Sequence, residues 1–123
     1  MGNKEHLTAQ VIAGEWGSLD RFAESHGISP ASTKMVIYVD GAKSRPVMEA
    51  MLKYGYLQLL AFEKWLKQKD MSYSFFLAEH GLNPVDLIFA IRNIDPKPAI
   101  RKLLMREGFS YGDFYSLTRR AEG

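Results

Sequence analysis

The chain has 123 residues, of which 46% are hydrophobic and 24% are charged, and its net charge is +2. These values are ordinary for one compact globular protein, or for two very small domains that share a core. The absence of cysteine excludes a disulfide framework and a cysteine-based zinc site, and it suits the reducing cytoplasm, where we expect the protein to act. The polar start MGNKEHLTAQ lacks the apolar run of a signal peptide, and no apolar run approaches the roughly 20 residues that span a bilayer. No membrane partner is therefore expected.

Helix signals follow one another along nearly the whole chain and predict an all-α protein. The first helix is expected over about residues 8–16. Ser18 is a good N-cap for a second helix over residues 19–25, because its hydroxyl can accept from a free backbone N–H. Gly27 follows that helix, as glycine commonly does beyond a helix end.

A third helix is expected from Ser29 and Pro30 to about Val39, because serine caps helices and proline suits the first helical turn. Its β-branched run MVIYV is also compatible with a strand, but the Ser-Pro start favours a helix. Pro46 opens a fourth helix that Gly55 closes. LQLLAFEKWLKQK forms a fifth, with lysines in its last turns, where they complement the helix dipole.

The rest of the chain repeats this order. The stretch RFAESHGISPAST returns later as FFLAEHGLNPVDL, with the same spacing. Ser72 and Asn83 stand where the caps of the first copy stand, and PKPAIRKLLMREGF corresponds to RPVMEAMLKYGY. Ser110 and Asp113 predict a last helix, YGDFYSLTRR. A tandem duplication explains this better than chance and divides the chain into units 1–69 and 70–123.

The stretch LDRFAESHGISPASTKMVIYVDG, followed by SRPVMEAMLKYGY, resembles the helix-turn-helix of Cro-like and Ner-like phage and plasmid regulators. Such a motif needs a small residue where its two short helices touch and a glycine at the turn. Ala23 and Gly27 suit these roles in the first copy. In the second copy Leu77 replaces the small residue, which puts the helix crossing there in doubt.

The resemblance implies that the third helix contacts DNA with its outward side. Outward positions of the first copy are small, hydroxylated or basic: Ser29, Pro30, Ala31, Ser32, Lys34, Met35 and Tyr38. Lys43, Ser44 and Arg45 follow at once and suit the phosphate backbone. The predicted DNA-binding residues are Ser29, Ser32, Thr33, Lys34, Tyr38, Lys43 and Arg45. Tyr38 and Thr33 are the weaker members of this set, and Thr33 also suits an inward position.

Outward positions of the second copy have a different character: Asn83, Pro84, Val85, Asp86, Ile88, Phe89 and Arg92. Asp86 would repel phosphate. Val85, Ile88 and Phe89 would form exposed apolar surface of a kind that monomers seldom leave uncovered. They are the predicted dimer or partner contacts, against a second copy of the chain, the first unit or another protein, and a homodimer is favoured.

The distribution of charge and the lack of catalytic motifs limit the functions that the sequence supports. Through Lys69 the chain has nine lysines and arginines against seven acidic residues, and from Asp70 onward it has seven of each, so the basic excess lies in the first half. No nucleophile motif, phosphate loop or dinucleotide fingerprint occurs. His26 and His80, at equivalent places beside the two turns, suit packing better than metal ligation. We therefore expect no catalytic residue, metal or cofactor.

The sequence thus predicts a regulator that binds double-stranded DNA sequence-specifically, as a repressor that occupies a promoter. The alternative is a helical adaptor or inhibitor that binds protein through the apolar face of the second copy. A small helical enzyme is a further alternative, against which the lack of a catalytic constellation counts.

Overall fold

The computed structural model describes residues 6–39, 41–95 and 97–109, and within these ranges it contains helices and no strand, which confirms the all-α class. The helices are α1 (Leu7–Trp16), α2 (Leu19–Ser25), α3 (Pro30–Tyr38), α4 (Arg45–Lys53), α5 (Tyr56–Gln68), α6 (Tyr73–His80), α7 (Pro84–Ile91) and α8 (Pro98–Glu107). The predicted last helix, near Ser110, lies outside the described residues. Among the helices described, none combines the length and apolarity needed to cross a bilayer.

Side-chain caps fix four of the helix starts that the sequence predicts. The oxygens of Ser18, Ser29, Ser72 and Asn83 each accept from a backbone N–H in the first turn of the following helix. The run MVIYV is helical as far as α3 extends, and Val39 is already extended, with φ −106° and ψ 118°. The cap therefore outweighs the β-branched composition of that run.

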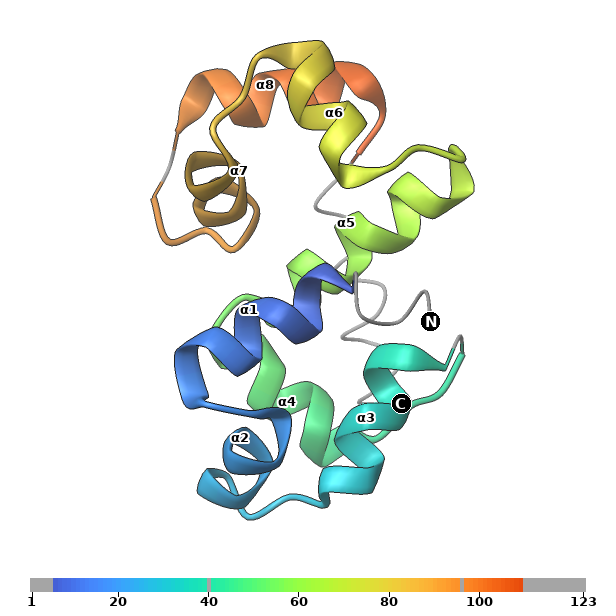
Figure 1. The fold of residues 1–123 in the computed structure, drawn as a ribbon, viewed down its shortest axis with the longest axis vertical. Helices are drawn as coiled ribbons and strands as arrows, with labels where there is room; N and C mark the ends of the chain where they lie inside the picture. The colour runs from blue at the N-terminus through green and yellow to red at the C-terminus, as the bar shows by residue number, and fades with distance from the viewer. Residues whose placement is uncertain (1–5, 40, 96, 110–123) are drawn as a thin grey trace.

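The helices enclose two hydrophobic cores, and α5 belongs to both. The first core lies among α1 to α4 and the start of α5, and includes Phe22, Met51 and Tyr56. The second lies among α6 to α8 and the rest of α5, and includes Phe62 and Phe76. Figure 1 shows the corresponding arrangement, with α1–α4 at one end of the molecule, α6–α8 at the other and α5 between them.

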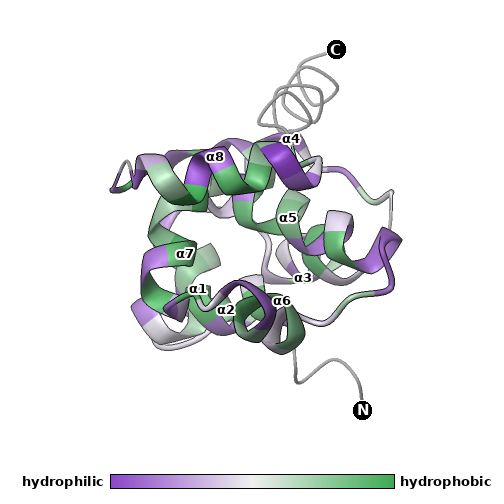
Figure 2. Ribbon diagram, turned by 90° about the horizontal axis from the view of Figure 1, so that it is seen from above, coloured by the Kyte–Doolittle hydropathy of each residue, from purple (hydrophilic) through white to green (hydrophobic). Residues whose placement is uncertain are grey.

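Each unit is built from short helices, of which α4, α7 and α8 are the most amphipathic. In the view of Figure 2 most helices carry hydrophobic and hydrophilic residues side by side. Isolated helices of this length are marginal in water, so their stability comes from packing the apolar side. The buried residues of α4, Val47, Met48, Ala50 and Met51, are spaced as one helix face requires.

Arg92, at the C-terminal end of α7, joins the second unit to the first. The sequence places it outward, but its side chain is only 4% exposed. Its Nε donates to the carbonyl of Tyr54 at 2.8 Å, and its Nη1 and Nη2 donate to the Glu15 carboxylate at 2.8 and 3.1 Å. Its guanidinium also lies 4.7 Å from the ring centre of Tyr56. The outward expectation is therefore wrong, because α7 packs on α5 and carries this arginine into the contact between the units.

Glu15 responds electrostatically to this contact. Burial acts to raise its pKa, but hydrogen bonds from Arg92 and Tyr56 and the charge of Arg92 outweigh burial and leave the pKa below its usual value. Burial, together with the hydrogen bond to Glu15, raises the pKa of Tyr56. Glu15 is therefore held as a carboxylate and Tyr56 as a neutral donor.

Gly55 allows the two units to approach at this place. It has φ +76°, and a Cβ atom built on it would lie 2.5 Å from the carbonyl oxygen of Arg92. A side chain would therefore meet backbone that belongs to the same contact. The sequence reveals this glycine as a helix end, but not as the point of closest approach between distant segments.

Glu63 on α5 sets the start of α1. Its carboxylate accepts from the backbone N–H of Leu7 at 2.8 Å and of Thr8 at 2.7 Å, and also from the Thr8 hydroxyl. A carboxylate at a helix N-terminus satisfies free N–H groups and complements the helix dipole. This cap comes from a residue far along the chain, so α1 begins one residue earlier than the local pattern indicates.

Candidate functional site

The α2–turn–α3 unit is tightly packed. Ala23 on α2 is fully buried, and Gly27 forms the turn with φ +65°. His26 bridges from Nδ1 to the carbonyl of Phe22 and from Nε2 to the hydroxyl of Tyr54, both at 2.8 Å. Both ring nitrogens are thus engaged, and His26 has the structural role that the sequence favours.

The solvent-exposed side of α3 forms one continuous stripe. Ala31, Lys34, Met35 and Tyr38 follow the i, i+3, i+4, i+7 spacing of a helix face, and all four are exposed. Met35 is 53% exposed, which is high for a large apolar side chain. We call these four residues the α3 outer face. The opposite side of the helix packs into the first core through Val36 and Ile37.

Thr33 does not belong to this surface. It is fully buried, and its hydroxyl donates to the carbonyl of Ser29 at 2.9 Å, one helical turn earlier. Its inclusion among the predicted DNA-binding residues was wrong, because it lies on the side of α3 that faces the core. Ser29 is exposed at the helix start, and Ser32 is half-buried.

Two members of the α3 outer face have neighbours. The Lys34 ammonium lies 3.2 Å from the Asp20 carboxylate, and both side chains are about half exposed. Tyr38 makes an edge contact with His6, with ring centres 5.0 Å apart. Exposed ion pairs of this kind contribute roughly 0–1 kcal/mol, so Lys34 can exchange its partner at little cost.

The predicted basic residues Lys43 and Arg45 lie at the connection between α3 and α4, and both are exposed. Arg45 pairs with Glu49 one helical turn later at 3.2 Å. Ser44, the N-cap of α4, makes no side-chain hydrogen bond to the helix. This connection therefore presents two cations and a helix start beside the end of α3.

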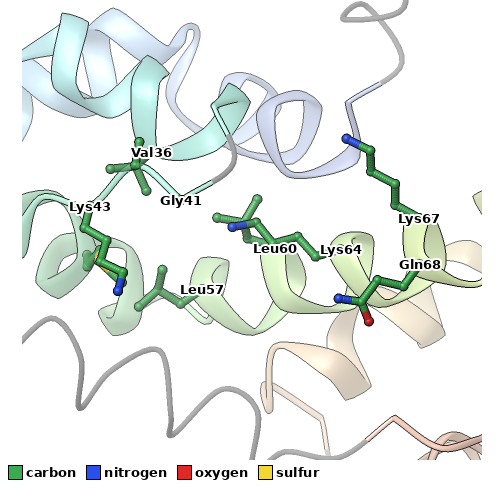
Figure 3. Close-up of a pocket in the computed structure, with 10 residues that line it drawn as sticks. Val36, Gly41, Lys43, Leu57, Leu60, Lys64, Lys67 and Gln68 are labelled. Carbon is green, nitrogen blue, oxygen red and sulfur yellow. The ribbon is translucent and has the colours of Figure 1, made fainter.

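The fold adds two lysines that the sequence argument left out. Lys64 and Lys67 of α5 line the same pocket as Lys43, as Figure 3 shows. The sequence indicated them only as lysines near a helix C-terminus. Their meeting with the α3–α4 connection depends on how α4 folds back onto α5, which no local pattern indicates.

The corresponding surface of the second unit is smaller than the sequence predicts. Val85 is 55% exposed, and Phe89 is half-buried. Ile88 is half-buried, as Phe89 is, and its buried part packs against the second core. Asp86 lies 3.5 Å from the Lys97 ammonium. The backbones of α2 and α3 approach each other closely. Those of α6 and α7 approach each other less closely, in keeping with Leu77, which is larger than the equivalent Ala23.

No family model, curated protein or solved structure matches this chain.

Proposed function

We propose that the protein is a DNA-binding transcriptional regulator whose α2–turn–α3 unit acts as a helix-turn-helix. The α3 outer face carries the proposal, since it is an exposed stripe with a lysine, a small residue and an exposed methionine on a helix otherwise packed into the core. A helix with these properties suits the major groove, which is wide enough to admit it.

Each exposed residue has a physical role in this proposal. Ala31 lets the helix approach the base edges closely. Lys34 donates to guanine or to phosphate, and Met35 offers an apolar contact for a thymine methyl group. Lys43 and Arg45 neutralise phosphates beside the groove and fix the register of the protein on the duplex. Occupation of a promoter, which keeps other proteins off the same DNA, is the mechanism of repression in this proposal.

The second unit supplies a dimer contact in this proposal. Its surface consists of the exposed Val85 with the half-buried Ile88 and Phe89, and dimers bind half-sites about one helical turn apart. The Asp86 carboxylate near the start of α7 would repel phosphate, so α7 is not proposed as a DNA-contacting helix.

Selection of bound duplexes from a random DNA pool tests the function. We expect one enriched sequence motif, repeated with two-fold symmetry at half-sites roughly 34 Å apart. A pool that shows no enrichment after repeated rounds would contradict sequence-specific binding. Enrichment of a single unrepeated motif would keep DNA binding and remove the dimer.

Val85→Asp is expected to convert the dimer into a monomer, because a charge at the centre of an apolar contact would be buried without a partner. Sedimentation velocity measures the change directly. The matched control is Ala99→Asp, which introduces the same charge at an exposed position on α8. If the Val85 variant sediments as the parent protein does, or if both variants dissociate alike, Val85 is not a dimer contact.

A protein-binding adaptor is the second candidate, favoured by the exposed Phe75, Val85 and Ile94 in the second unit. The salt dependence of DNA affinity separates the two functions. If the protein binds DNA through phosphate contacts, its affinity for DNA falls steeply as the salt concentration rises. An adaptor that binds only protein would show no DNA affinity with this steep salt dependence.

A further inference from the structure

A pocket of about 470 Å³ lies between the α3–α4 connection and α5. Its apolar lining consists of Val36, Met48, Leu57 and Leu60, and each of these belongs to the first core. The pocket thus reaches from the surface to the core beneath α3 and α4. Its volume falls within the range of roughly 300–1,000 Å³ that small-molecule sites occupy.

Lys43 and Lys64 stand beside this apolar lining. Figure 3 shows them on opposite sides of it, Lys43 on the α3–α4 connection and Lys64 on α5, while the Lys67 side chain extends away. In the part of the chain that the structure describes, neither Lys43 nor Lys64 forms an ion pair with a carboxylate. Two ammonium groups without counter-charges therefore border an apolar hollow.

We propose that this pocket binds a small amphipathic anion, with an apolar body against the core residues and one carboxylate between Lys43 and Lys64. A neutral apolar compound would leave both ammonium groups without a partner. A small inorganic anion would pair with the lysines but would make no use of the apolar atoms that line the pocket. Only a ligand with both parts gains from burial of apolar area and from charge-assisted hydrogen bonds.

The proposed site has a regulatory consequence that rests on the proposed function. Lys43 is also a proposed phosphate contact, so an anion that engages it removes one cation from the DNA-binding surface. The ligand also contacts Val36 on the buried side of α3, next to Met35 of the α3 outer face. Ligand and DNA therefore oppose each other, and by linkage each weakens the binding of the other by the same factor.

The test uses the full-length, isotope-labelled protein and three probes, monitored by amide chemical shifts. Octanoate has the charge and the apolar body, octanol has the body alone, and inorganic phosphate has the charge alone. We expect octanoate to shift the amides of Gly41, Leu57 and Leu60, and to bind about tenfold or more tightly than either of the other probes, the worth of one charged hydrogen bond.

Lys64→Gln is expected to weaken octanoate binding about tenfold, since it removes the charge and keeps most of the side chain. The matched control, Lys53→Gln, changes an exposed lysine of α4 outside the pocket and should leave octanoate binding unchanged. Equal binding of octanoate by both variants and the parent protein overturns the proposal. Equal binding of octanoate and phosphate, or shifts confined to α7 and α8, overturns it as well.

One further outcome concerns the chain's own C-terminal residues. If the pocket amides respond to Phe114→Ala in the 123-residue chain but not to octanoate, the pocket belongs to that segment and the proposal fails.

A separate DNA titration keeps the two proposals distinguishable. Octanoate binding without any effect on DNA affinity retains the site and removes its regulatory role, whereas failure to bind octanoate leaves the DNA result unaffected.

Discussion

Lys34→Glu is expected to reduce the affinity for a selected DNA site by on the order of 100-fold while leaving the helical circular dichroism signal unchanged. Lys34 is the cation of the α3 outer face, and the substitution both removes its contact and places a negative charge against phosphate. Its side chain is half exposed and pairs with the equally exposed Asp20, so this ion pair contributes little to the fold. A gel shift or fluorescence anisotropy titration at fixed salt measures the loss.

Two further variants separate a contact from a general effect of charge. Lys34→Gln should cost less than the glutamate variant and should lower the slope of log affinity against log salt by about 1. Lys102→Gln removes the same charge from an exposed position on α8, in the second unit, and should change affinity little.

Asp20→Asn, in contrast, should strengthen DNA binding, because it removes a carboxylate 3.2 Å from Lys34. Unchanged binding by Lys34→Glu would remove α3 as the DNA-contacting helix.

Arg92→Ala is expected to lower the free energy of unfolding by about 3 kcal/mol, because it breaks an ion pair whose arginine is buried and leaves a carbonyl without its donor. Arg92 makes three hydrogen bonds that join α7 to Glu15 of α1 and to Tyr54. Glu15 is 43% exposed, so the estimate stays at the lower end of the range for buried pairs. Urea denaturation followed by circular dichroism measures the difference, and Lys102→Ala is the control at an exposed position.

The pH dependence of this loss identifies its cause. The pKa of Glu15 is lowered by folding, so its contribution is complete above the ordinary value near 4.5 and disappears as the pH falls through the lower folded-state pKa. The difference between the parent protein and Arg92→Ala should therefore shrink below about pH 4.5. A constant difference from neutral to acidic pH would assign the loss to packing and to the Tyr54 carbonyl alone.

Local sequence determined where four of the described helices begin and what class of fold the helices build. Serine or asparagine before Pro30, Pro84 and two further helices specifies the start through a hydrogen bond that spans only two or three residues, and the structure contains each of these bonds. The alternation of small, apolar and polar residues likewise placed the α3 outer face toward solvent. Such features depend on neighbours along the chain, which a sequence displays directly.

The tertiary structure alone decided which distant groups meet. Glu63 starts α1, Arg92 enters the contact beneath Gly55, Thr33 turns inward, and Lys64 joins the α3–α4 connection. A residue that would face solvent on an isolated helix becomes buried when another helix packs over it. Which helix packs there depends on how the side chains of both cores pack together. The repeated segments of the sequence specify two similar units, but the packing of α7 on α5 specifies how those units differ.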